Sequence, residues 1–143
     1  MCHGSFAFLY YAGGLRRYIK IVDQYSGIQS TKSYATLLWF FGQYLYSQGK
    51  TDEAIQKLEE SKLAFERINK IDSEYCKCIS ILCEIYLKTY QDNPSQNKSY
   101  FIKAEEIDNI LEEKKKLMKY KMRQFVSQRR NTIENIRKNN PKL

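Results

Sequence analysis

The sequence predicts an all-α protein built from antiparallel helical hairpins. The chain has only six Gly and two Pro in 143 residues, and such long stretches without helix-breaking residues favour helices. Apolar residues recur at spacings of 3, 4 and 7, which places them on one face of a helix. A hydrophobic content of 43% is enough to form the core of one domain. We expect helices at 34–48, 51–69, 73–90 and 99–114, and no strand.

Residues 34–69 form the clearest predicted hairpin. The apolar face of its first helix consists of Leu38, Phe41, Gly42 and Leu45. Gly49 interrupts this helix, and Thr51 or Asp52 is expected to cap the next one. The apolar stripe of that second helix consists of Ala54, Leu58, Ser61 and Phe65. Because the connecting turn is so short, the two helices should lie antiparallel, with Gly42 at their contact.

Two further helices are predicted after this hairpin. The helix over 73–90 repeats the apolar spacing at Ile79, Leu82, Cys83 and Tyr86. A polar loop with Pro94 follows over 91–99. The next helix starts near Ser99, and the sequence leaves open whether it continues into the basic tail. Residues 15–25, before the first hairpin, also have a helical pattern.

Positive charge is concentrated at the end of the chain. Residues 114–143 hold eleven Lys/Arg and one acid, whereas residues 1–113 are nearly neutral. We therefore predict a helical body over 1–113 and a basic amphipathic helix or tail over 114–143, whose removal should leave the body folded. The apolar residues of the tail are Met118, Met122, Phe125, Ile133 and Ile136. Its candidate binding residues are Lys114, Lys115, Lys116, Lys119, Lys121, Arg123, Arg129 and Arg130.

Three interpretations of this tail stay open. It could cap the helical body and show its charge to water, or bind nucleic acid or an acidic surface by counterion release. It could also lie on an anionic membrane. Because acids hardly dilute its charge, we predict weak, salt-sensitive binding to nucleic acid or another acidic surface.

A short pattern of one large, one small and one large residue recurs along the chain. Its copies are Phe6-Ala7-x-x-Tyr10, Phe41-Gly42-x-x-Leu45 and Leu82-Cys83-x-x-Tyr86. The small residue lets a second helix approach closely, and the large residues fill the space on either side. Recurrence at intervals of 35 and 41 residues is typical of a helical repeat protein.

The pattern resembles the tetratricopeptide repeat. Leu38, Phe41-Gly42, Leu45 and Ala54 fall at the spacings of that family, and residues 47–54 are similar to its inter-helix turn. The sequence departs from the family in having Leu38 in place of Trp, no Pro near residue 66 and an inserted loop at 91–99. The resemblance implies a short right-handed solenoid of about three hairpins, the first incomplete, that binds a protein or peptide in its concave groove.

The resemblance also implies which residues face that groove. On the first helices of successive repeats, the groove positions fall on Thr36, Trp39, Gln43, Tyr46 and Ser47, and on Lys77, Ser80, Glu84, Leu87 and Lys88. From these we select Trp39, Gln43, Tyr46, Ser80, Glu84 and Lys88 as the candidate partner-binding residues. The alternative is that Trp39 and Tyr46 pack against the neighbouring hairpin. The set of basic and asparagine residues with which some members of the family bind the C-terminal carboxylate of chaperones is absent. Chaperone C-termini are therefore not expected as ligands.

Catalysis and metal binding are not expected. The sequence has one histidine, His3, no Gly-rich phosphate loop and no nucleophile elbow. Cys76 and Cys78, two apart on a helix, point about 200° from each other, so they should pack in the core rather than share a metal. We therefore predict no enzyme activity and no cofactor.

We expect a cytoplasmic interaction module, because no apolar span of about 18 residues occurs and residues 6–11 are too short for a signal peptide. The alternative function is a sensory or regulatory fragment of a signalling or transcription regulator whose tail contacts nucleic acid. The start inside a repeat suggests a piece of a longer protein.

Overall fold

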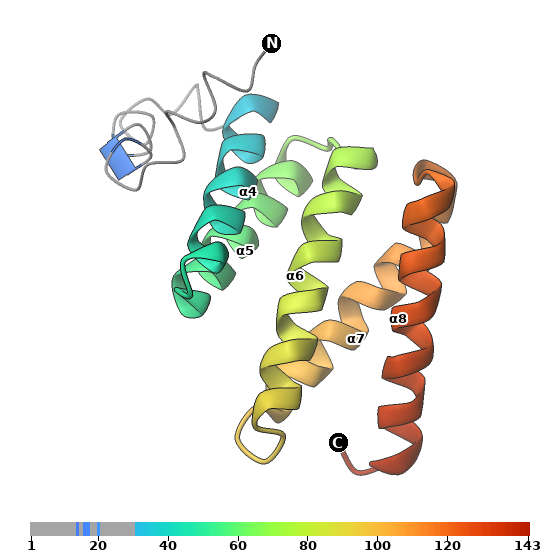
Figure 1. Cartoon of the computed structure of the whole chain (residues 1–143). Coiled ribbons are helices and arrows are strands. Elements are labelled where there is room, and N and C mark those ends of the chain that lie inside the picture. The colour runs from blue at the N-terminus through green and yellow to red at the C-terminus, as the bar shows by residue number, and fades with distance from the viewer. Residues whose placement is uncertain (1–13, 15, 18–19, 21–30) are drawn as a thin grey trace. The chain divides into compact units, whose positions relative to one another are not determined.

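A computed structural model describes residues 14, 16–17, 20 and 31–143, and every regular element within 31–143 is a helix (Figure 1). The chain divides into two compact units, residues 1–71 and 72–143, which are described separately below. The first unit contains α4 (Lys32–Ser47) and α5 (Thr51–Arg67). The second contains α6 (Ser73–Asp92), α7 (Lys98–Glu113), a 3-10 turn η1 (Lys115–Leu117) and α8 (Tyr120–Asn139).

The predicted all-helical class is confirmed for these residues, and the four expected helices agree with α4 to α7 within two residues at each end. The predicted helix over 15–25 lies mostly outside the described residues, and the repeat copy that begins at Phe6 lies wholly outside them.

Side-chain caps fix the starts of α4 and α6. The Thr31 hydroxyl accepts a hydrogen bond from the backbone N–H of Tyr34 at 3.2 Å. The Asp72 carboxylate accepts from the N–H groups of Glu74 and Tyr75 at 3.0 and 3.2 Å. Each cap satisfies N–H groups that have no partner inside the helix.

The expected cap of α5 was wrong, because Lys50 occupies the N-cap position and makes no side-chain cap bond. Gly49 adopts a left-handed φ of 78°, and the Lys50 N–H returns to the carbonyl of Leu45 at 2.9 Å. The chain therefore turns within three residues, and Thr51 is already helical.

Gly42 lies at the contact between α4 and α5, as expected. A Cβ atom at this position would lie 2.6 Å from Cγ of Leu58 and 3.3 Å from the carbonyl oxygen of Ala54. Nearby, the buried Ser61 hydroxyl donates a hydrogen bond to the carbonyl of Ala35 at 2.7 Å. The fully buried core of this hairpin includes Leu38, Phe41, Leu45, Leu58 and Phe65.

The contact between α6 and α7 repeats this arrangement. The Cys83 thiol, in the position equivalent to Gly42, donates to the carbonyl of Ala104 at 3.3 Å. Ala104 is in turn the counterpart of Ala54, because the inserted loop accounts for the difference in spacing. In both hairpins a small residue of the first helix therefore meets the backbone of an alanine in the second.

The basic tail forms a helix of its own, which runs beside α7 in the same direction as α6 (Figure 1). The continuous helix that the sequence left open is not formed, because α7 ends at Glu113. Met118 is extended, with φ −106° and ψ 146°, and only 4% exposed. Burying Met118 at the end of the turn directs α8 back along the hairpin.

The apolar face of α8 differs from the predicted one. Val126 and Ile133 are buried, whereas Phe125 is 47% exposed. Phe125 precedes Val126 and so lies about 100° away from it around the helix.

Candidate functional site

The predicted contact residues of α4 share one face, because Trp39, Gln43 and Tyr46 follow each other at intervals of four and three. Trp39 is 9% exposed, and its ring stacks on Phe40 with centroids 5.1 Å apart. Gln43 and Tyr46 are half-buried. Within the described residues nothing accepts a hydrogen bond from the buried indole N–H of Trp39. This face therefore combines a buried indole ring whose N–H has no acceptor among the described residues with two half-buried polar side chains.

The predicted residues of α6 are in part occupied by the chain itself. The Ser80 carbonyl and hydroxyl accept hydrogen bonds from Arg129 of α8 at 2.9 and 3.0 Å. The Glu84 carboxylate lies 3.5 Å from the same guanidinium group, and Lys88 is exposed. The predicted concave surface would include these α6 residues and the α4 face. Because these belong to different units, the shared surface stays a prediction.

Arg129 is the residue of this site that the sequence analysis placed wrongly, among the solvent-facing cations. Its side chain is 3% exposed, and its guanidinium lies 5.1 Å from the centre of the Phe125 ring. The pattern contained a signal, since Val126, Arg129 and Ile133 follow the spacing of a buried helical stripe. This spacing does not by itself indicate burial, because an arginine rarely lies in a core unless it is paired.

Two more tail arginines connect α8 to α7. Arg130 binds the Asp108 carboxylate at 2.9 Å and Glu134 at 3.2 Å. Arg137 makes two hydrogen bonds to the carboxylate of Glu105, one of them 3.0 Å long. The pairs with Asp108 and Glu105 join α8 to α7, and they favour the capping interpretation for the second half of α8.

Asp108 is the buried member of this seam. It is 3% exposed, and one of its oxygens has no hydrogen-bond partner within the described residues. Burial raises the pKa of the carboxyl, and the nearby Arg130 and Arg129 oppose that rise. Burying the charged carboxylate of Asp108 is therefore unfavourable by itself. Nothing in the sequence indicated that Asp108 would be buried.

The candidate basic residues separate into two groups. Lys115 pairs with Glu112 at 2.9 Å, so together with Arg129 and Arg130 it has a carboxylate partner inside the chain. In the described part of the chain no ion pair involves the other five, which are Lys114, Lys116, Lys119, Lys121 and Arg123.

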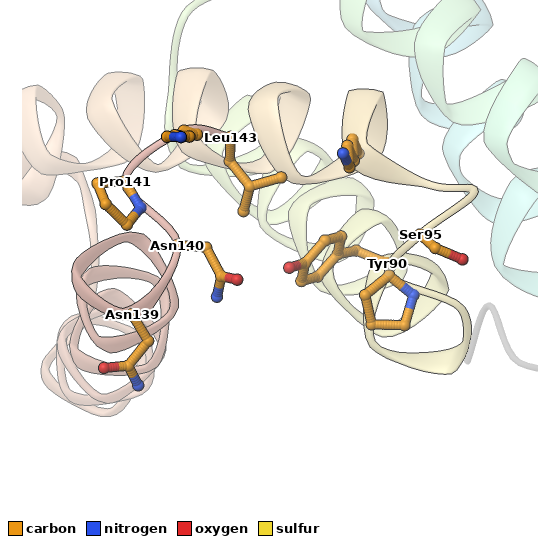
Figure 2. Close-up of a pocket in the computed structure, with 9 residues that line it drawn as sticks. Tyr90, Ser95, Asn139, Asn140, Pro141 and Leu143 are labelled. Atoms are coloured by element: carbon orange, nitrogen blue, oxygen red, sulfur yellow. The ribbon is translucent and has the colours of Figure 1, made fainter.

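A hollow with a volume of about 460 Å³ lies at the other end of α8. Figure 2 shows Tyr90 and Ser95 on one side of it, and Asn139, Asn140, Pro141 and Leu143 on the other. The charged side chains of its lining are Lys98 and Lys142. The hollow therefore offers amides, a tyrosine and two cations.

Three cysteines of α6 pack in the core, as expected: Cys76, Cys78 and Cys83 are all buried. Burial raises the pKa of the Cys83 thiol to about 12, which keeps it protonated at neutral pH. Among the described residues no group of three His, Cys, Asp or Glu side chains is placed to hold a metal ion. Within the same residues no helix is long and apolar enough to cross a membrane.

Comparisons of the chain with protein-family models, with curated proteins and with solved structures find no significant match.

Proposed function

We propose that this chain is a protein- or peptide-binding module of tetratricopeptide type, and that its α4 face makes the central contact. The observation that carries the proposal is the buried Trp39 indole N–H, which has no acceptor in the described part of the chain. A buried donor left unpaired costs about 1–3 kcal/mol. A backbone carbonyl of a bound peptide would satisfy that donor once the side chains that cover the indole nitrogen move aside.

The neighbours of Trp39 fit this role. Gln43 and Tyr46 are half-buried, so part of each side chain is accessible on the same helix face as Trp39. Tyr and Trp are enriched in protein interfaces because they combine a large apolar area with one hydrogen-bonding group. A peptide that crosses α4 would cover the exposed parts of Gln43 and Tyr46 and pair with the amide and the hydroxyl.

The repeated helix contact supports the solenoid part of the proposal. Gly42 and Cys83 occupy equivalent places in two hairpins, and equivalent places align when repeats stack. Within the second unit Lys88 is exposed, so of the three predicted α6 residues it is the one most open to a partner. Ser80 and Glu84 already bind Arg129, so α8 acts as the cap of the stack there.

Selection from a random peptide library, followed by titration, tests the proposal. Trp39 is the only tryptophan, so its fluorescence reports binding at this face. We expect Gln43→Ala and Tyr46→Ala to weaken a selected peptide about 10-fold, a loss of about 1.4 kcal/mol. Trp39→Phe keeps an aromatic ring but removes the N–H and the fluorescence signal, so its affinity is measured by calorimetry. It should bind about 3- to 10-fold more weakly, as expected for the loss of one hydrogen bond.

Leu63→Ala is the matched control, because Leu63 is an exposed apolar residue of the same hairpin and lies on α5. It should leave the affinity unchanged. A library without binders, or equal losses for Leu63→Ala and Tyr46→Ala, would contradict the proposal.

A further inference from the structure

A cationic surface covers the start of α8 and the turn before it. It consists of Lys114, Lys116, Lys119, Lys121 and Arg123, and we call it the α8 basic patch. All but the half-buried Lys114 are exposed, and residues 114–133 contain no Asp or Glu. Five cations within ten residues repel one another, and an anionic partner would remove that repulsion.

The outward side of α8 carries a row of neutral amides. Gln124, Gln128, Asn131 and Asn135 are all exposed and follow one another at intervals of 4, 3 and 4, so they lie along one face. The opposite side is buried through Val126, Arg129 and Ile133. The helix is thus anchored along one side and presents donors and acceptors along the other.

These features distinguish between anionic partners. A helix that lies on a membrane needs an apolar face along its length, whereas the exposed apolar residues Leu117, Tyr120 and Phe125 are confined to the start of α8 and the turn before it. Further along the helix the outward side carries the amides Gln128, Asn131 and Asn135. Asn and Gln side chains form paired hydrogen bonds with base edges in the major groove of DNA. That groove is about 12 Å wide in B-form DNA and admits a helix, whereas the A-form groove of duplex RNA is too narrow.

We propose that α8 binds double-stranded DNA, with the α8 basic patch on the phosphates and the amide row facing the major groove. The ion pairs of Arg130 and Arg137 would hold the helix at a fixed angle to the hairpin. This inference goes beyond peptide binding and uses a different helix, so either activity can fail without the other.

The test measures how the full chain binds a random-sequence DNA duplex of about 20 base pairs across roughly 50–200 mM salt. The variant Lys116→Gln/Lys119→Gln/Lys121→Gln/Arg123→Gln removes four charges of the patch. Its salt-dependence slope should fall by about 3–4, since each phosphate contact contributes about 0.9. The matched control removes four exposed charges elsewhere, as Lys50→Gln/Lys70→Gln/Lys77→Gln/Lys98→Gln, and should keep most of the slope.

A second variant tests the amide row without a change in charge. Gln128→Ala/Asn131→Ala/Asn135→Ala should weaken DNA binding several-fold and leave the salt slope unaltered. The proposal is overturned by equal losses in the two charge variants, or by no binding at low salt. Equally tight binding to duplex RNA, or to vesicles that contain phosphatidylserine, would also overturn it, because either would show that the amide row and the groove play no part.

Discussion

At the scale of single residues, two positions decide how the helices meet. Gly42 lets α5 approach α4, since no side chain fits between its Cα and Leu58. In the second unit the contact is made by a large residue instead. The long side chain of Arg129 spans the space between α8 and Ser80 of α6. The sequence identified Gly42 from the spacing of its neighbours, whereas it assigned Arg129 to the surface.

Replacing Gly42 with leucine should destabilise the protein by about 1–3 kcal/mol. The new side chain would overlap the fully buried Leu58, and overpacking of this kind strains both helices. Urea denaturation measures the change. Ser33→Leu is the control, because Ser33 is an exposed position of the same helix. Equal unfolding free energies for Gly42→Leu and the unaltered chain would contradict the close contact.

We predict that substitutions of Ser80 and of Arg129 lower the stability of the protein by different amounts. Ser80→Ala should cost about 1–3 kcal/mol, because it leaves a buried guanidinium N–H without its acceptor. Arg129→Met should cost less, because it removes the buried charge itself, and the Glu84 carboxylate that loses its partner is 33% exposed. Urea denaturation of both variants and of the double variant gives the coupling energy. The site is not as described if Arg129→Met proves the more harmful change.

At the scale of elements, helix positions follow local patterns and helix ends depend on particular caps. Apolar spacing placed α4 to α7, because each stripe repeats within its own helix. The start of α5 and the break after α7 were not foreseen. The left-handed Gly49 determines the first, and the burial of Met118 determines the second.

The α7–α8 seam should respond to pH through Asp108. Because its pKa in the folded state is raised above the ordinary 3.8, folding favours the protonated form. The stabilising contribution of Asp108 to folding is therefore fully present below pH 3.8, the ordinary pKa. It declines as the pH rises through the higher pKa of the folded state. We expect the stability of the unaltered chain relative to Asp108→Asn to fall from pH 3.5 towards pH 7, about where carboxyl groups titrate. Urea denaturation at several pH values checks this, and a difference that grows with pH would contradict it.

At the scale of the whole molecule, the tail belongs to the second unit rather than being an appendage of a complete body. Met118, Val126 and Ile133 are buried, and the tail arginines pair with acids of α6 and α7. We therefore revise the expectation that the body stays folded without residues 114–143. The truncated chain should melt at a lower temperature than the intact one.

Circular dichroism measures that difference, with the intact chain as reference. An unchanged melting temperature would show that α8 contributes nothing to the stability of α6 and α7.

The sequence by itself determined the helical class, the helix positions and the contact at Gly42, because these depend on patterns that repeat within one or two helices. Only the tertiary structure decided which tail cations have carboxylate partners and which remain exposed. Arg129 and Ser80 are 49 residues apart, and Arg137 and Glu105 are 32 apart. Whether a charge is paired or free depends on what the fold brings beside it, and neighbours so distant in the chain leave no local pattern.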